Sequence, residues 1–342
     1  MGAMTKKEVF DVLEYYHAQG GNFIDAANNY QSGQSETYLG EWLSSRPGLR
    51  DQMVVATKYS FAHTAFSGYD GTIHSNYGGN GTKSLRLSVE ASLKKLQTDY
   101  IDILYVHWWD YTTSIPELML SLNTMCEQGK VLYLGISDTP AWVVSKANEY
   151  ARCKGLRQFV VYEGRWSAAD RDFERDILQM CAAEGMGLTP WGALGGGNFK
   201  SEKQREAAKA DTGRNLTMLR ERDIKVSQIL EKIADKKGTL ITSIALAYVM
   251  HKAPYVFPVV GGRKVDHLKG NIEALSLELT RAELEEIESA VEFDQGFPMN
   301  FIGMGQNVTG AKDVKFSAIG GVFDYVEGVM VSPFAYRTTV PC

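Results

Sequence analysis

Short apolar runs recur along the chain, and most of them are followed by a segment with the spacing of an amphipathic helix. The runs are rich in Val, Ile, Phe and Tyr and are bounded by turn residues, which is typical of strands. Strands that alternate with helices at intervals of roughly thirty residues indicate parallel βα units in an α/β fold. We predict strands at residues 22–27, 53–59, 103–108, 132–138, 159–163, 187–191 and 256–261.

Several of the intervening segments predict helices with clear starts. Residues 5–19 place apolar side chains on one face behind a capping box that begins at Thr5, and residues 82–97 repeat the periodicity. A second capping box, at Thr280, begins another helix. Because the strands are apolar almost throughout, both faces of the sheet must be covered, as in a barrel or a doubly wound sheet.

Two connections are too long to be simple links. Residues 60–81 are rich in glycine and aromatic residues, and residues 193–222 run from a glycine cluster into a charged segment. Long loops in a compact domain are usually functional or disordered. Both follow predicted strands, so we expect both at the carboxyl-terminal face, where barrel enzymes place their sites.

A closed barrel of this kind has eight strands, one more than the pattern predicts, and the chain begins directly with a helix. Either a strand is missing at the N-terminus or one of the predicted strands is misassigned. If the first barrel strand is missing, a partner chain or residues 314–342 would take its place. That tail contains the strand-like stretch "GVMVSPFAYRTTV", which Pro333 confines to an edge or a bend. We predict that the tail packs against the barrel opening. The alternative is a weakened or inactive protein.

Composition and charge narrow the class of protein. The 342 residues are 44% hydrophobic and 23% charged, as in soluble globular proteins, and the net charge of −5 argues against a nucleic-acid binder. No apolar run is long enough for a membrane span, and the first residues lack the apolar region of a signal peptide. We expect a cytoplasmic protein with reduced thiols and no bound metal, and a homo-oligomer stays open. No metal or disulfide spacing links the cysteines, which are Cys126, Cys153, Cys181 and Cys342.

Ionisable residues stand at the ends of three successive predicted strands. Asp25 lies in "NFIDAA", Lys58 in "MVVATKY" and His107 in "ILYVHW". The carboxyl ends of parallel strands meet at one edge of a sheet, so we expect Lys58 to pair with Asp25, and Tyr30 to lie in the loop just above them. Each of these residues alone could be structural, but four converging ionisable groups indicate a functional site.

These four residues suit the reduction of a carbonyl group. Negative charge develops on the carbonyl oxygen as hydride reaches the carbon, and the oxygen needs a hydrogen-bond donor and then a proton. The ammonium of Lys58, held by Asp25, is expected to lower the pKa of the Tyr30 phenol from its ordinary value of about 10. Neutral His107 can donate an N–H to the same oxygen.

Segments of the chain resemble, in order, the signatures of aldo-keto reductases, in particular of the fungal aryl-alcohol dehydrogenase and norsolorinic acid reductase branch: "GGNFIDAANNY", "VVATKY", "ILYVHWWD", "GISDTPAW", "PWGALGGG" and "GGRKVDHLKGNIEAL". The resemblance implies a (β/α)8 TIM barrel at residues 1–310, without the N-terminal hairpin and first strand, and a tail at 311–342. It also implies hydride transfer between NADPH and an aldehyde or ketone. The catalytic tetrad would be Asp25, Tyr30, Lys58 and His107.

The resemblance further implies where NADPH or NADP⁺ binds. Ser137 and Asp138 would hold the nicotinamide amide with Glu163 opposite, and Trp191 would stack on the nicotinamide ring. The pyrophosphate would lie against the backbone of Gly192, Ala193, Leu194 and Gly195, continuing to Gly197. The adenosine 2′-phosphate region, where arginine can bind phosphate through two hydrogen bonds, would comprise Gly261, Gly262, Arg263, Lys264, His267 and Asn271.

Two of these cofactor positions depart from many relatives, which carry Asn and Gln where this chain has Asp138 and Glu163. An ionised carboxylate accepts hydrogen bonds but cannot donate them. We therefore expect negative charge here to favour the cationic oxidised nicotinamide and alcohol oxidation. Without the resemblance, Arg263 and Lys264 could equally be a solvated helix start.

We expect an aromatic substrate pocket, which suits flat carbonyl compounds or alcohols such as aryl aldehydes or polyketide ketones. Its walls would come from Trp108 and Trp109 and from the loop residues Phe61, Phe66, Tyr69 and Tyr77, although either tryptophan could instead pack the barrel. A metal-dependent hydrolase is disfavoured because the 6 histidines include no H-x-H pair. A non-catalytic NADPH-binding barrel that acts as a sensor or interaction protein stays open.

Overall fold

The computed structural model describes residues 4–64, 71, 73–208, 218–305 and 307–321. Two compact units divide the chain. The first comprises Met1–Gly164, Ala183–Gly187 and Gly261–Leu268, and the second comprises Arg165–Ala182, Leu188–Val260 and Lys269–Cys342. The expected packing of the tail falls largely on residues 322–342, which lie outside the described residues.

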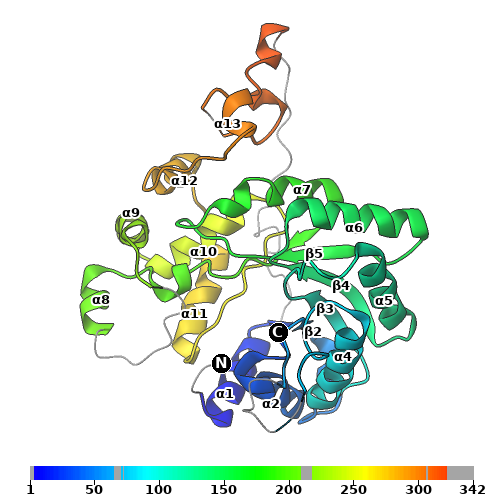
Figure 1. Ribbon diagram of the computed structural model, residues 1–342. Helices are drawn as coiled ribbons and strands as arrows, with labels where there is room; N and C mark the ends of the chain where they lie inside the picture. Colours follow the sequence, from blue (N-terminus) through cyan, green and yellow to red (C-terminus); the bar gives the residue numbers. More distant parts are fainter. Residues whose placement is uncertain (1–3, 65–70, 72, 209–217, 306, 322–342) are drawn as a thin grey trace, which may run out of the picture. The chain divides into compact units, whose positions relative to one another are not determined.

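A parallel sheet forms the centre of the first unit (Figure 1). Its strands follow one another in the order of the sequence, and every pairing between consecutive strands from the first to the fifth is parallel. The prediction of parallel βα units is therefore confirmed. The strands are β1 (Phe23–Asp25), β2 (Val54–Tyr59), β3 (Ile101–Val106), β4 (Val131–Ser137) and β5 (Phe159–Glu163), and β6 (Gly187–Leu188) is the sixth in the order.

Helices of the first unit cover this sheet, with α4 packed against β2 and α5 against β4 (Figure 1). The capping box predicted at Thr5 begins the first helix, and the helix predicted at 82–97 is present as α4. The helices are α1 (Lys6–Ala18), α2 (Gln34–Leu43), α3 (Leu49–Gln52), α4 (Thr82–Leu96), α5 (Ile115–Glu127) and α6 (Ala141–Lys154).

One face of the sheet is filled by large side chains that approach the carboxyl ends of the strands. Ala56, Ile103, Tyr105 and Val161 form a buried cluster there. Tyr105 is paired with Gly135 across β3 and β4, and a Cβ atom at Gly135 would lie 2.5 Å from the tyrosine ring. The absent side chain at Gly135 therefore gives the Tyr105 ring its place beside Lys58, whose Nζ lies 5.4 Å from the ring centroid.

The second unit is mainly helical in its described part. Its elements include α9 (Glu221–Lys237), α10 (Ile241–Lys252), α12 (Arg281–Glu288) and α13 (Met299–Ile302), while α7 (Ile177–Glu184) and α11 (Val265–Glu273) run across the boundaries between the units. The capping box predicted at Thr280 begins α12. Residues 193–222, expected as a long connection, contain the helix α8 (Glu202–Ala208).

The last two predicted strands are shorter than expected. Residues 187–191 give only β6, and residues 256–261 give an isolated bridge between Leu188 and Val256 rather than a strand. Phe257 N donates to Leu188 O (2.7 Å) and Val259 N donates to Pro190 O (2.9 Å). The prediction of a full strand at 256–261 is wrong because Pro190 has no N–H to donate to Phe257 O, the next bond of the ladder.

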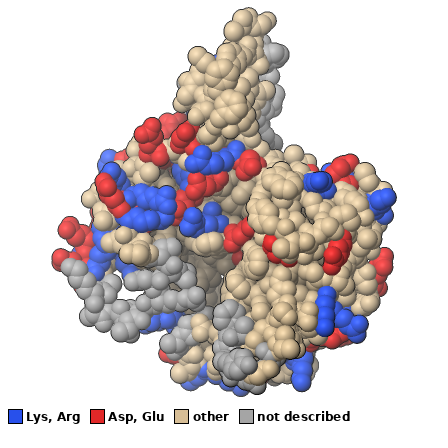
Figure 2. All heavy atoms as spheres, in the orientation of Figure 1, with Lys and Arg blue, Asp and Glu red and all other residues tan. Residues whose placement is uncertain are grey.

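Charged side chains of both signs are interspersed on the face shown in Figure 2 rather than gathered into a basic surface. This distribution fits the net charge of −5. Among the described helices, none is both long and apolar enough to cross a membrane.

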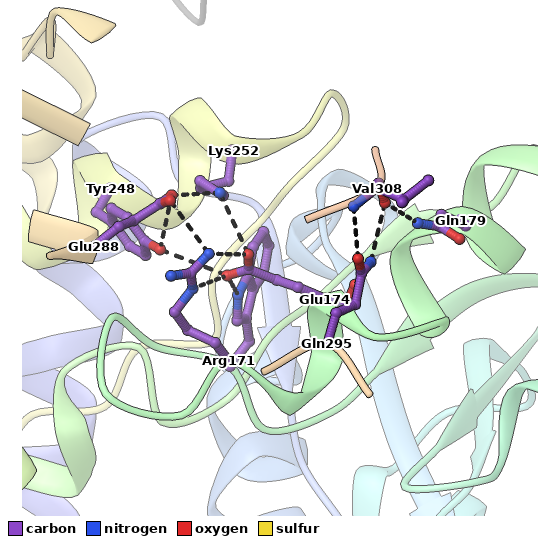
Figure 3. A network of polar contacts seen from close by, with 9 residues as sticks. Arg171, Glu174, Gln179, Tyr248, Lys252, Glu288, Gln295 and Val308 are labelled. Atoms are coloured by element: carbon purple, nitrogen blue, oxygen red, sulfur yellow. Dashed lines mark hydrogen bonds and ion pairs between the residues drawn. The ribbon is translucent and has the colours of Figure 1, made fainter. Parts of the chain in front are cut away.

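An ion network stabilises the second unit (Figure 3). The buried guanidinium of Arg171 pairs with Glu174 (2.8 Å) and Glu288 (3.2 Å), and Lys252 contacts the same two carboxylates. Trp166 Nε1 also donates to Glu174 (3.0 Å). The network ties the loop after β5 to the ends of α10 and α12.

The same network extends to the segment that follows α12. Gln295 donates to the backbone oxygens of Glu174 (3.3 Å) and Val308 (3.0 Å) and accepts from Val308 N (2.7 Å) (Figure 3). Gln179 of α7 donates to Val308 O as well (2.9 Å). Side-chain hydrogen bonds of Gln179 and Gln295 thus hold the backbone of Val308.

We predict that Arg171→Met destabilises the protein by about 3–5 kcal/mol, because it leaves buried carboxylate charge with one partner fewer. Arg175→Met is the matched control. The guanidinium carbon of Arg175 lies 5.3 Å from the centroid of the Phe293 ring, but the Arg175 side chain is 41% exposed and pairs with exposed Asp172. Its loss should cost less than about 1 kcal/mol. Urea unfolding of the two variants measures the difference, and equal losses would contradict the prediction.

Candidate active site

Five polar side chains gather at the carboxyl edge of the sheet, all from the first unit. Asp25 and Glu163 are the last residues of β1 and β5, Lys58 is the last but one of β2, and His107 directly follows β3. Tyr30 begins a 3-10 turn, Tyr30–Gly33, in the loop after β1. Parallel strands bring these positions together because their carboxyl ends lie at one edge.

The ammonium of Lys58 is fully buried and is the centre of the group. It donates a hydrogen bond to Asp25 Oδ1, so the ion pair predicted from the sequence is present. It also donates to the backbone oxygen of Ala26 (3.1 Å). A third acceptor, Glu163 Oε1, lies 3.2 Å from Lys58 Nζ. A buried ammonium is tolerated when acceptors of this kind satisfy it.

Sequence reasoning missed the contact between Glu163 and Lys58. It placed Glu163 near the cofactor amide through the family resemblance, not beside the lysine. The signal was available, because Glu163 ends a strand just as Asp25 does and therefore reaches the same edge.

Tyr30 and His107 flank the lysine. Lys58 Nζ lies 5.3 Å from the centroid of the Tyr30 ring, and the Tyr30 and His107 ring centroids are 5.9 Å apart in an edge-to-face arrangement. The structure therefore brings together all four residues proposed as a catalytic tetrad.

The acidity of Tyr30 differs from the sequence-based expectation. Burial raises the pKa of Tyr30 to about 12, and the charges of Asp25 and Glu163 act in the same direction. Lys58 lowers the pKa, as expected, but its effect is outweighed. Without ligands, the phenol thus holds its proton at neutral pH.

Lys58 stays charged under the same conditions. Burial opposes its ionisation, but Asp25, Glu163 and Tyr30 together raise the pKa of the lysine above its ordinary value. Burial raises the pKa of both carboxyls, whereas it acts to lower the pKa of the lysine. Burial raises the pKa of Asp25, an effect that Lys58 opposes, and burial and then the charge of Asp25 raise the pKa of Glu163 to about 8.

His107 is a neutral imidazole in this environment. Burial, and then the charge of Lys58, lower the pKa of His107 to about 3. A neutral imidazole carries one N–H donor and one acceptor nitrogen. Its Nδ1 is buried and has no hydrogen-bond partner within the described residues.

Aromatic side chains adjoin His107. The ring of Phe61 lies 4.9 Å from His107 and 5.7 Å from Trp108, both edge-to-face. Trp109 is instead buried beside Tyr111 (6.4 Å), so the structure brings Phe61 and Trp108 to the tetrad and gives Trp109 a packing contact. Phe66 and Tyr69 of the same expected pocket lie outside the described residues.

The expected cofactor residues of the first unit lie at two places. Ser137 is buried at the end of β4, and Asp138 follows it with a left-handed backbone (φ 41°). The second place is the start of α11, where the side chains of Arg263, Lys264 and His267 are exposed. Gly261 and Gly262 directly precede these three residues.

The remaining cofactor candidates belong to the second unit. The ring of Trp191 lies 5.9 Å from the guanidinium of Arg165. Gly192 and Gly195 have positive φ angles of 76° and 64°, which glycine adopts without strain, and Gly195 N donates to Gly192 O (2.8 Å) in a tight turn. This turn also contains Ala193 and Leu194, and Asn271 lies in α11.

Three polar atoms around the tetrad fit a ligand that carries polar groups. Glu163 Oε2, His107 Nδ1 and Trp108 Nε1 are buried and have no hydrogen-bond partner in the described part of the chain. Buried polar atoms normally have partners, so an amide and a carbonyl oxygen of bound molecules are suitable complements. The residues present therefore fit a nicotinamide cofactor and a carbonyl substrate.

Comparison with known proteins shows the family of the chain. The profile described as "Aldo/keto reductase family" matches residues 1–292. The chain belongs to this family. It is 56% identical over 324 residues to norsolorinic acid reductase B of Dothistroma septosporum, covering 94% of this chain and 81% of that protein. A second norsolorinic acid reductase B, from Aspergillus parasiticus, is 54% identical, and the match covers 96% of this chain and 87% of that protein.

A yeast relative is named as an aryl-alcohol dehydrogenase. The probable aryl-alcohol dehydrogenase AAD4 of Saccharomyces cerevisiae is 50% identical over 315 residues, covering 90% of this chain and 95% of its own. The resemblance inferred from the sequence segments is therefore confirmed, and this aldo/keto reductase is an oxidoreductase.

We predict that His107 stays neutral in the unliganded protein down to about pH 4. The folded state protonates it only near pH 3, whereas the unfolded chain does so near 6.5, so the free energy of unfolding decreases as the pH falls through this window. In His107→Gln, which cannot be protonated, the loss between pH 7 and pH 5 should be smaller by at most about 2 kcal/mol. Denaturant unfolding at both pH values measures this difference. Nitrogen NMR of the imidazole checks the charge directly, and a protonated ring at pH 5 would contradict the assignment.

Proposed function

We propose that the protein is an NADP-dependent reductase or alcohol dehydrogenase that acts on aromatic or polyketide-type carbonyl compounds and their alcohols. The observation that carries the proposal is the buried Lys58, fixed by Asp25 beside the phenol of Tyr30 and the neutral ring of His107. We further infer that the parallel sheet belongs to the (β/α)8 barrel of the family and that the protein works in the cytoplasm.

Tyr30 is the general acid of the reduction in this proposal. Bound NADPH would supply the hydride for the carbonyl carbon. The Tyr30 phenol gives its proton to the carbonyl oxygen, so the substrate gains two electrons and two hydrogens, and the same phenolate accepts the proton in the reverse direction. Lys58 stabilises the phenolate, and the N–H of His107 orients the oxygen.

The chain offers binding groups for each part of the cofactor. Ser137, Asp138 and Glu163 would hold the nicotinamide amide, and Trp191 would stack on its ring. The glycine turn after Trp191 would contact the pyrophosphate through backbone N–H groups. The exposed cations Arg263 and Lys264, with His267 and Asn271, would bind the adenosine 2′-phosphate end.

The substrate class rests on the aromatic surface next to His107. Phe61 and Trp108 suit a flat aromatic ring adjoining the reacting carbonyl. The names of the relatives, norsolorinic acid reductase and aryl-alcohol dehydrogenase, support the same class.

We expect Tyr30→Phe to lower turnover of aromatic aldehydes by about 10²–10⁴-fold, the usual contribution of a general acid. NADPH affinity, measured by fluorescence, should stay the same, because the phenol acts on the substrate. Tyr16→Phe is the matched control, since the Tyr16 hydroxyl donates to Phe23 O (3.0 Å) and accepts from Phe23 N (3.3 Å) in the same unit. Tight NADPH binding without turnover in the wild type would instead favour a non-catalytic protein that acts as a sensor or interaction protein.

The preference for NADPH over NADH depends on charge at the 2′-phosphate. We expect Arg263→Ala to weaken NADPH binding roughly tenfold or more, the value of a charge-assisted hydrogen bond, and to leave NADH binding nearly unchanged. Arg46→Ala, a half-exposed arginine paired with Glu14, controls for the loss of one positive charge. Equal weakening of both cofactors in Arg263→Ala would remove this residue from the phosphate site.

A further inference from the structure

The three hydrogens of the Lys58 ammonium already face acceptors. An ammonium has three N–H donors. Its acceptors are Asp25 Oδ1, the backbone oxygen of Ala26 and, at 3.2 Å, Glu163 Oε1, while the centroid of the Tyr30 ring lies 5.3 Å from the same nitrogen. Since Asp25 and Ala26 are held in or beside β1, the hydrogen that faces Glu163 is the one for which Tyr30 can compete.

Only one of the two oxygens of the Glu163 carboxyl has a partner among the described residues. Its side chain is 4% exposed, Oε1 faces Lys58, and Oε2 is buried with no hydrogen-bond partner within the described ranges. A buried carboxylate in such a position is costly unless it is protonated or fully paired.

The charged and titratable groups around Glu163 come from several elements. Lys58 of β2 attracts its negative charge, and Asp25 of β1 and Asp138 after β4 oppose it. Its own charge acts in turn on Tyr30, where it raises the pKa of the phenol. Burial and these neighbours bring the pKa of Glu163 to about 8, so the residue changes charge close to neutral pH.

We propose that Glu163 is a positioning residue that competes with Tyr30 for Lys58, so that the proton on Glu163 controls how acidic the Tyr30 phenol is. Protonated Glu163 gives up the ammonium to Tyr30, and the phenol becomes the stronger acid that reduction needs. Ionised Glu163 draws the ammonium to itself and repels the phenolate. The inference rests on the proposed function in taking Tyr30 as the acid.

This inference changes the expectation drawn from the sequence for Asp138 and Glu163. That expectation treated both as permanent negative charges that favour the oxidised cofactor. The geometry makes the charge of Glu163 conditional, and it links that charge to the catalytic lysine as well as to the cofactor.

The test measures the acidity of residue 30 in the unliganded protein. Difluorotyrosine placed at position 30 gives a fluorine NMR signal for this phenol alone and lowers its titration into a range where the fold survives. We expect Glu163→Gln to lower the phenol pKa by at least one unit, a tenfold gain in acidity. Glu163→Asp keeps the charge on a shorter side chain and should lower it less.

Asp138→Asn is the matched control for loss of a nearby negative charge. Asp138 is not among the main groups that shift the pKa of Tyr30, so its removal should leave the phenol pKa within a few tenths of a unit. An unchanged pKa in Glu163→Gln, or an equal drop in Asp138→Asn, would overturn the proposal. Should Glu163→Gln fail to fold, the wild-type fluorine signal still decides, because ionisation of Glu163 near pH 8 must give it a separate inflection; a signal without one overturns the proposal.

A kinetic measurement extends the test to turnover. Wild-type aldehyde reduction should decline as the pH rises through about 8, because Glu163 ionises there. Glu163→Gln should keep its rate to higher pH, whereas parallel pH profiles would contradict the competition for Lys58. If Tyr30→Phe retained full activity, the proposed function would fail, yet the fluorine titration would still show whether Glu163 sets the acidity of residue 30.

Discussion

A buried ammonium, that of Lys58, is the constraint on which the rest of the site depends. Removing this charge from water costs several kcal/mol, and only well-placed acceptors compensate for it. Asp25, the last residue of the three-residue strand β1, and the backbone of Ala26 directly after it supply these acceptors. The short strand is sufficient because its pairing with β2 fixes Asp25 opposite Ala56, one pleat below Lys58. The ion pair between Asp25 and Lys58 therefore depends on the strand pairing and also fixes the lysine of the proposed site.

Much of this site could be predicted from the sequence, because periodicity determines where strands end. The positions of Asp25, Lys58 and His107 follow from three apolar runs and from the rule that parallel strands end at one edge. The prediction of a strand at 256–261, by contrast, was wrong. The apolar composition of this segment is that of a strand, but Pro190 lacks the donor that the ladder requires after Leu188.

The electrostatics of the site could not be predicted from the sequence in the same way. The sequence showed an amine close to a phenol and suggested a lowered pKa, whereas burial and two carboxylates raise the pKa of Tyr30 to about 12. The balance depends on depth and distance, which no spacing of residues reveals. The strand end at Glu163 indicated the edge that this residue reaches, but its contact with Lys58 depends on side chains meeting across the face of the sheet, from strands that are not neighbours.

A phenol with a raised pKa keeps its proton until the substrate binds. Its pKa must then fall during the reaction for the proton to be transferred. Among the groups that act on Tyr30, Asp25 is hydrogen-bonded to Lys58, and a proton on Asp25 would remove the negative charge from that ion pair. Glu163 is different, because one of its oxygens has no protein partner in the described residues and its pKa lies close to neutrality. Within this group, the charge on Glu163 is therefore the quantity that can change while the ion pair stays intact.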